Sequence, residues 1–235
     1  MQTARGNPSH QFLGSSTQAI YRRQVAFLAA ILHEYTQAPA DQIKILDWGC
    51  GKGHITYLLR ACGFKVTSCD VLSTSDDSAF GQEVPIVQLK GISVVPLAHV
   101  SQLPFEDQTF DCVVSFGVLE HVHSDVASLK QIRRILKPGG LFFITLLPYF
   151  LSWTQALARL RGITYHDRLY NHQQLRLLAQ NAGFHVAATS HAQLFPKNIV
   201  HIALDPVLEP IDRFLCQWTP LKYLATNLEA VLVAD

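Results

Sequence analysis

Apolar side chains recur along this chain with two spacings, one typical of helices and one typical of buried strands. In residues 26–35 the apolar positions follow the i, i+3, i+4, i+7 spacing of a helix with one buried face: Leu28, Ile31, Leu32 and Tyr35. The stretch IKILDW at 43–48 is short and almost continuously apolar, which predicts a buried strand. A helix therefore precedes the first strand.

Strands and helices continue to alternate towards the C-terminus. Helical spacing returns at Ile55, Leu58, Leu59 and Cys62, and Gly63 supplies a stop. A third helix is predicted from Val126 to Leu136, closed by the breakers in KPGG, and a fourth through Leu175 to Ala182, capped by Asn171 with Gln174 and stopped by Gly183. The remaining predicted strands are KVTSCD, ISVVPL, DCVVSF, LFFITLL, FHVAATSHAQLF and LEAVLVAD.

This alternation predicts an α/β fold of one domain over residues 1–235. Right-handed crossovers between successive strands give a Rossmann-like, doubly wound, mostly parallel seven-stranded sheet with helices on both faces. Residues 1–40 form an N-terminal helical segment, and residues 196–226 form an α-helical insertion before the last strand. Residues 72–91 lack helical periodicity where a crossover helix is expected.

Composition argues against a nucleic-acid-binding, secreted or membrane-spanning protein. Nineteen basic and eighteen acidic residues give a net charge of +1, so the chain lacks the positive surface that nucleic acid binding requires. Five cysteines, an odd number without CxxC spacing, favour a reducing, cytoplasmic environment and no structural zinc. The first residues lack a signal-peptide core, and the longest apolar run, LFFITLLPYFLSW, is shorter than the roughly 20 residues of a transmembrane helix.

Three glycines follow the first predicted strand, in the stretch LDWGCGKG. Gly49, Gly51 and Gly53 permit positive φ and close approach of backbone amides to a ligand at the carboxyl end of the strand. Asp70 ends the second strand, where a carboxylate can accept the hydroxyl hydrogens of a ribose. Such a turn or either aspartate alone is equally well explained by local structure, but their joint placement favours a nucleoside.

Four motifs in the same order resemble those of class I S-adenosylmethionine-dependent methyltransferases: LDWGCGKG, Asp70, LPFEDQTFDCVVSFGVLEHV and LKPGGLFFIT. The resemblance runs from about Ile43 to Phe184 and is nearest to the subgroup of ubiquinone-pathway, menaquinone-pathway and natural-product methyltransferases. It implies S-adenosyl-L-methionine as cofactor and S-adenosyl-L-homocysteine as product. An NAD-dependent oxidoreductase is disfavoured, since GxGxxG would place a glycine where His54 stands.

The resemblance also implies roles for individual residues. The glycine turn, with Asp47 behind it, would hold the methionine moiety of the cofactor. Asp70 would hold the ribose, and the end of the fourth strand would lie beside the sulfonium. His99 stands where many relatives have an aspartate near adenine, so the amide of Val100 and the side chain of Gln102 are expected to contact that base. The implied cofactor-binding residues are Asp47, Gly49, Cys50, Gly51, Gly53, Asp70, Val71, Val100, Ser101, Gln102, Phe116 and Gly117.

Histidine is the natural general base near neutral pH. We expect His121 or His166 to act in this way, although each of the eleven histidines is individually as well explained by a surface or core role. In the family, residues 149–170 have the position of a substrate lid, where Arg168, Tyr170 and His172 are expected to shape the pocket. Glu120 is read as stabilising a helix N-terminus. Some quinone-pathway relatives hold a divalent cation with Glu-x-x-Glu-His, but Gly117 replaces the first glutamate, so no metal is expected.

The leading interpretation is methyl transfer by in-line displacement to a small apolar or aromatic acceptor, at oxygen. The alternatives are a catalytically inactive partner subunit that binds the cofactor, and methylation of nitrogen or carbon in a small molecule or lipid. The apolar insertion at 196–226 could cap such an acceptor, form a homodimer, contact a lipid or membrane surface peripherally, or only cover the sheet edge.

Overall fold

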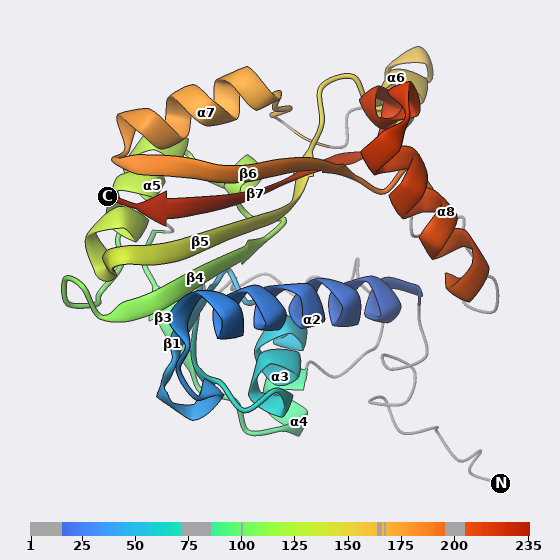
Figure 1. Ribbon diagram of the computed structural model, residues 1–235. Coiled ribbons are helices and arrows are strands. Elements are labelled where there is room, and N and C mark those ends of the chain that lie inside the picture. Colours follow the sequence, from blue (N-terminus) through green and yellow to red (C-terminus); the bar gives the residue numbers. More distant parts are fainter. Residues whose placement is uncertain (1–15, 72–85, 100, 164–165, 167, 196–204) are drawn as a thin grey trace, which may run out of the picture.

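The predicted doubly wound fold is confirmed in the computed structural model, which describes residues 16–71, 86–99, 101–163, 166, 168–195 and 205–235 (Figure 1). One seven-stranded sheet has the order β3-β2-β1-β4-β5-β7-β6. The first five strands and β6 run parallel, and β7 is antiparallel to both of its neighbours. The strands are β1 (Lys44–Trp48), β2 (Lys65–Val71), β3 (Val94–Leu97), β4 (Phe110–Phe116), β5 (Leu136–Pro148), β6 (Phe184–Ala192) and β7 (Asn227–Ala234).

Helices cover both faces of this sheet. Each face has its own apolar core, one contributed by α2 and α3 and the other by α5 and α7. The α-helices are α2 (Ser16–Thr36), α3 (His54–Ala61), α4 (Ile86–Leu89), α5 (Asp125–Ile135), α6 (Trp153–Leu160), α7 (His172–Asn181) and α8 (Asp205–Trp218). Short 3-10 turns are η1 (Ala40–Gln42), η3 (Leu119–His121) and η5 (Pro220–Leu224).

The central strands divide their side chains between these two cores. On β4, Cys112 and Val114 belong to the α2 and α3 side, whereas Val113 belongs to the α5 and α7 side. All three are fully buried, as expected for a parallel strand covered on both faces. The near-continuous apolar runs in the sequence reflect this double burial.

A β-bulge interrupts the pairing of β5 with β7. Ile144 pairs with Ala230 and Leu147 with Leu228, so Thr145 and Leu146 together face Glu229. Leu146 has a φ of 58°, a left-handed conformation that is unusual for a branched side chain. Bulges of this kind bend a strand and re-aim its side chains. This one lies at the carboxyl end of β5, beside the end of β4.

The prediction that the helix after β4 extends to Leu136 is wrong. The helix α5 ends at Ile135, and Leu136 already pairs with Phe110 as the first residue of β5. KPGG therefore lies inside the strand, where Gly139 has a φ of +73° and a Cβ on Gly140 would come within 2.8 Å of the Lys137 carbonyl oxygen. Pairing with β4 overrides the local breaker signal.

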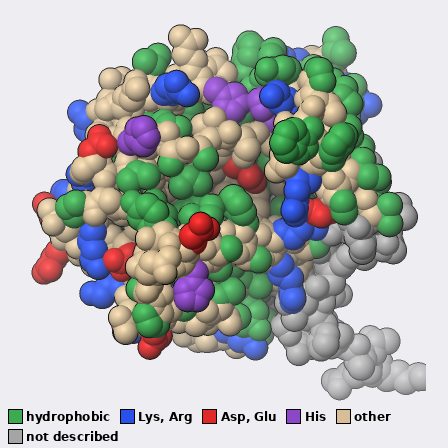
Figure 2. All heavy atoms as spheres, in the orientation of Figure 1, with side chains coloured by type: hydrophobic (Ala, Val, Ile, Leu, Met, Phe, Trp, Pro, Cys, Tyr) green, Lys and Arg blue, Asp and Glu red, His purple; other side chains and the backbone are tan. Residues whose placement is uncertain are grey.

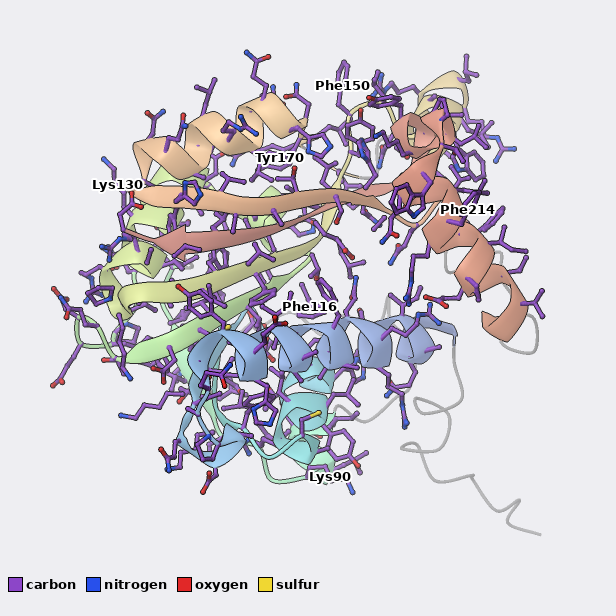
Figure 3. The ribbon with its side chains drawn as sticks, viewed as in Figure 1. Lys90, Phe116, Lys130, Phe150, Tyr170 and Phe214 are labelled. Atoms are coloured by element: carbon purple, nitrogen blue, oxygen red, sulfur yellow. The ribbon has the colours of Figure 1, made fainter. Side chains whose placement is uncertain are left out.

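Both segments that fitted the strand–helix alternation poorly are only partly described. Residues 72–85 and 196–204 lie outside the described residues, and α4 occupies four residues of the first segment. The insertion before β7 contributes α8 and η5, and Phe214 projects outward from α8 (Figure 3). Within the described ranges, no helix has the length and apolarity needed to cross a membrane. The large apolar side chains that α8 and η5 expose are Val207, Ile211, Phe214, Trp218, Leu221, Tyr223 and Leu224.

The predicted cap of α7 is confirmed as a reciprocal capping box. The Asn171 side chain accepts a hydrogen bond from the Gln174 amide at 2.9 Å, and the Gln174 side chain accepts one from the Asn171 amide at 3.0 Å. These two bonds satisfy donors at the start of the helix that have no partner within it.

We predict that Asn171→Ala lowers the free energy of unfolding by about 1 kcal/mol, because it removes the acceptor at the N-cap. Chemical denaturation measures this change. The exposed neighbour Gln173 makes no such bond, and Gln173→Ala serves as the matched control. Equal stability of the two variants would contradict the role of the cap.

Candidate active site

The glycine turn after β1 is fixed to the end of β2 by backbone hydrogen bonds. The amides of Gly49 and Cys50 both donate to the carbonyl oxygen of Cys69, at 2.9 Å and 3.1 Å. The amide of Gly51 donates to Oδ2 of Asp70 at 2.5 Å. The turn and the acidic residue that the sequence singled out are therefore in direct contact.

The three glycines of this turn have different surroundings. A Cβ on Gly49 would lie 2.6 Å from Cγ2 of Val118, and one on Gly53 would lie 2.5 Å from Cγ1 of Val87. At both positions the packing of the protein itself excludes a side chain. Gly51, with a φ of +50°, is exposed, and no described atom lies within 4 Å of its Cβ position. Gly51 thus borders the open space that a ligand can enter.

Asp47 lies behind the turn rather than on its surface. Its side chain is 1% exposed and accepts a hydrogen bond of 2.6 Å from the hydroxyl of Thr56 on α3. Burial raises the pKa of Asp47 to about 6, against the opposing effect of the hydrogen bonds from Thr56. The contact ties the end of β1 to the first turn of α3, on either side of the glycines.

Phe116 and Gly117 lie at the carboxyl end of β4, next to β1. The amide of Gly117 donates to the carbonyl of Thr145 at 3.1 Å. Tyr21 of α2 packs edge-on against Phe116 with ring centroids 6.1 Å apart, and its ring lies 6.2 Å from that of His54. The sequence analysis missed Tyr21, although it lies seven residues before Leu28 and continues the apolar face of that helix.

The residues expected near adenine follow β3 at the same edge of the sheet. Asp70 pairs with Pro96 and Val71 with Leu97, which brings the end of β3 beside the end of β2. Beyond it the amide of Gln102 donates to the carbonyl of His99 at 3.0 Å, and both side chains are exposed, as is Val71. Ser101 is half-buried in the same turn, and Val100 lies outside the described residues.

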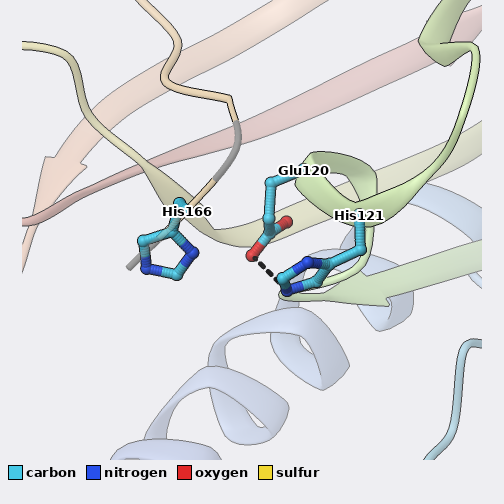
Figure 4. A group of neighbouring side chains, drawn as sticks. All are labelled: Glu120, His121 and His166. Carbon is cyan, nitrogen blue, oxygen red and sulfur yellow. Dashed lines mark ion pairs between the residues drawn. The ribbon is translucent and has the colours of Figure 1, made fainter. Parts of the chain in front are cut away.

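A carboxylate and two imidazoles converge after β4 (Figure 4). Glu120 is 3% exposed, its Oε1 lies 3.8 Å from Nε2 of His121, and its Oε2 has no hydrogen-bond partner within the described part of the chain. Burial raises the pKa of Glu120 to about 7. The rings of His121 and His166 are 6.1 Å apart, so the structure brings together the two histidines selected from the sequence.

These three side chains offer ligand atoms that all lie within 4.8 Å of one another. One carboxylate and two imidazoles are a donor set suited to a divalent transition metal. The sequence analysis expected no metal because it searched for a second glutamate near Glu120. The second imidazole comes instead from His166, a residue distant in the sequence.

Tyr170 and Arg168, two of the residues expected to shape the acceptor pocket, bind the backbone around Glu120. Tyr170 is buried and donates its hydroxyl hydrogen to the carbonyl of Leu119 at 3.2 Å, directly before Glu120. Arg168 donates to the carbonyl of His123 at 2.6 Å. Both contacts hold the segment that carries Glu120 and His121.

His172 begins α7 and faces β6 rather than Glu120. Its Nε2 lies 3.1 Å from Nε2 of His191, and its Nδ1 lies 3.0 Å from the hydroxyl of Thr189. Burial lowers the pKa of His172, and it lowers the pKa of His191 to about 4. Burial therefore favours the neutral form of both imidazoles.

A family model described as a methyltransferase domain matches residues 20–189 of the chain. The chain belongs to this methyltransferase family. Its cofactor is S-adenosylmethionine, and the glycine turn, Asp70 and the end of β4 lie at the carboxyl edge of the sheet, where open α/β folds bind nucleotides.

Curated relatives match only part of their own length. The chain is 37% identical over 98 residues to the human mitochondrial arginine-hydroxylase NDUFAF5, covering 41% of this chain and 26% of that protein. It is 29% identical over 143 residues to the ubiquinone biosynthesis O-methyltransferase of Bartonella tribocorum, covering 60% of this chain and 55% of that protein. The chain thus spans about a quarter to about half of these relatives.

Solved structures show the same fold at low sequence identity. A 1,6-didemethyltoxoflavin-N1-methyltransferase from Burkholderia thailandensis, bound to 1,6-didemethyltoxoflavin and S-adenosylhomocysteine, superposes with a TM-score of 0.55 at 19% identity, covering 100% of this chain and 93% of that one. The PH0226 protein of Pyrococcus horikoshii gives a TM-score of 0.58 at 19% identity, covering 95% of this chain and 96% of that one.

We predict that Gly51→Val weakens S-adenosylhomocysteine binding at least about tenfold, because the added side chain projects into the open space beside the turn. Isothermal titration calorimetry measures the affinity. Gly91→Val is the matched control, since Gly91 has a φ of +59°, is exposed and has equally open surroundings, but precedes β3 at the opposite end of that strand. Equal loss of binding in both variants would assign the effect to backbone strain.

Proposed function

We propose that the protein transfers the methyl group of S-adenosylmethionine to a hydroxyl oxygen of a small apolar or aromatic acceptor. The observation that carries this proposal is the position of Glu120, a buried acid immediately beyond the end of β4. Its Oε1 lies 3.5 Å from the Cβ position of Gly117. A group that can accept a proton is thus next to the backbone proposed to face the sulfonium.

The cofactor is proposed to lie along the carboxyl ends of β1, β2 and β4. Gly49, Cys50, Gly51 and Gly53 would hold the methionine moiety, with Asp47 supporting the turn from behind. Asp70 and Val71 would contact the ribose, and residues 99–102 the adenine. Phe116 and Gly117 would border the sulfonium. The contacts of the turn with Cys69 and Asp70 support this arrangement, since they align the amides of the turn with the end of β2.

Methyl transfer to a hydroxyl requires loss of one proton. The bond between the sulfonium sulfur and the methyl carbon breaks as the acceptor oxygen bonds to that carbon, and the hydroxyl proton must pass to a base. Glu120 suits this step because its pKa of about 7 lets the carboxylate accept a proton near neutral pH. His121 and His166 flank Glu120 and are the proposed alternatives for this base.

The same three side chains support a variant of this proposal. Glu120, His121 and His166 would hold a divalent cation, which when bound would polarise the acceptor hydroxyl and lower its pKa. Chelation separates the two versions, since loss of activity with EDTA and its recovery with one added divalent metal would require the cation.

Binding of the protein to a lipid surface or to a second copy of itself stays a prediction. The exposed apolar face of α8 and η5 is consistent with the peripheral lipid contact or homodimer expected for the insertion. All five cysteines are free, and the reducing, cytoplasmic environment expected from their number stays a prediction.

We predict that kcat/KM rises with pH through about 7 and that Glu120→Gln lowers kcat about 10²-fold or more, because the base works only when deprotonated. The assay follows labelled methyl transfer to a panel of aromatic hydroxyl compounds and matched amines. Glu106→Gln, an exposed acid in the loop before β4, is the control. Undiminished turnover by Glu120→Gln would exclude Glu120 as the base, and transfer to the amines alone would move the acceptor atom from oxygen to nitrogen.

Asp70→Ala should weaken S-adenosylhomocysteine binding by about 1 to 3 kcal/mol, the usual cost of losing hydrogen bonds to a charged group. Calorimetry with S-adenosylhomocysteine and its 2′-deoxyribose analogue tests whether the lost contact is with ribose. The native protein should prefer the hydroxylated compound, and the variant should bind both alike. A preference that survives in the variant would place the ribose elsewhere.

A further inference from the structure

A cavity of about 480 Å³ lies between α2, the end of β6, β7 and α8. Its volume is in the range of pockets for small organic molecules. Figure 2 shows this face, where basic and acidic side chains gather between α2 and α8. The polar and charged side chains of its lining include Arg23, Gln24, Glu209, Asp212, Arg213 and Glu229.

Glu229 is the unusual residue of this cavity. It shares a face of β7 with Val231 and Val233, which pack against the apolar core beneath α2. Its carboxylate accepts a hydrogen bond of 2.8 Å from Nε2 of Gln24. Burial raises the pKa of Glu229, and across the described residues no cation forms an ion pair with it. Glu229 itself is only half-buried, but an acid on the core-facing side of a strand rarely has a neutral amide as its main partner.

The side chain of Gln24 offers a second acceptor at the same place. Its Oε1 is buried and has no hydrogen-bond partner among the described residues. A buried acceptor without a donor carries an energetic cost that a bound ligand can remove. Glu229 and Gln24 together therefore present oxygen atoms to a group that donates hydrogen bonds.

Glu229 is linked to the end of β4 through a second cavity and the bulge of β5. A smaller cavity of about 60 Å³ is lined by Gln24 and Glu229 as well, and also by Thr145. Thr145 lies in the bulge opposite Glu229, and its carbonyl accepts the hydrogen bond from the Gly117 amide. The bulge thus connects Glu229 with the end of β4.

The other carboxylates of the cavity have partners within its wall. Glu209 on α8 is 2.5 Å from Nη2 of Arg213 and 3.9 Å from Nε of Arg23. Asp212 accepts a hydrogen bond of 2.8 Å from the Phe195 amide. Three carboxylates therefore face two guanidinium groups, and both of these groups lie beside Glu209.

We propose that this cavity receives the end of the acceptor remote from the methylated oxygen, and that Glu229 and Gln24 select a positively charged amine there. This inference rests on the proposed function and narrows its substrate class to aromatic hydroxyl compounds that carry an ammonium group. An ammonium group donates hydrogen bonds to both oxygen acceptors and compensates the Glu229 charge. The apolar wall formed by Ile20, Phe27 and Cys216 suits the hydrocarbon part of such a molecule.

The test is calorimetric titration of the protein saturated with S-adenosylhomocysteine, using three phenols that differ in the charge of one tail: tyramine, 4-ethylphenol and 3-(4-hydroxyphenyl)propionate. Tyramine should bind about tenfold or more tightly than 4-ethylphenol, and the carboxylate compound should bind weakest. Glu229→Gln keeps the size of the side chain and a hydrogen bond to Gln24 but removes the charge. It should abolish the advantage of tyramine.

Two further variants distinguish a specific loss of tyramine binding from a loss of folding. Gln24→Met removes the second acceptor together with the amide that donates to Glu229, keeps the Glu229 carboxylate, and should reduce tyramine affinity. Glu106→Gln removes an exposed acid outside the cavity and should leave the ranking unchanged. Undiminished affinity for S-adenosylhomocysteine shows that each variant is folded.

The outcomes separate this inference from the proposed function. Failure of the native protein to bind S-adenosylhomocysteine would overturn the function itself. Binding of that compound with equal affinity for the three phenols, no binding of tyramine, or an unchanged ranking in Glu229→Gln would overturn only the assignment of the cavity.

Discussion

The carbonyl oxygen of Cys69 is the fixed point on which the cofactor side of this structure depends. It accepts hydrogen bonds from the amides of both Gly49 and Cys50, and so holds the turn after β1 against the end of β2. The next amide of the turn, that of Gly51, is thereby directed at Asp70. Without this anchoring the glycines would gain conformational freedom at the one place where an ordered backbone is needed.

Much of this side of the molecule follows from the sequence because its determinants are local. Buried parallel strands leave continuous apolar runs, and the turn, the helix after it and the acid ending β2 occur within 26 residues, 45–70. The failure at Leu136 has a physical cause of the same kind. The local signal of KPGG predicts a stop, but pairing of Leu136 with Phe110 determines the outcome, and that contact is not local.

The acceptor side could not be predicted in the same way, since its residues come from distant segments. Glu120 and His166 come together where Tyr170 binds the carbonyl of Leu119, the first residue of η3, and Arg168 binds that of His123 just beyond it. Glu229 reads in the sequence as an ordinary polar position of an alternating strand. Only the insertion of β7 between β5 and β6, with the bulge at Thr145 and Leu146, turns it towards Gln24.

The helix α2 connects the two halves of the site, and this has a thermodynamic consequence. Tyr21 packs on Phe116 beside the cofactor region, and one turn further along Gln24 binds Glu229. Any shift of α2 that accompanies the filling of one region changes the contacts available to the other. If the two regions bind cofactor and acceptor as proposed, linkage requires that each ligand alter the affinity for the other by the same factor, with α2 as the element that couples them.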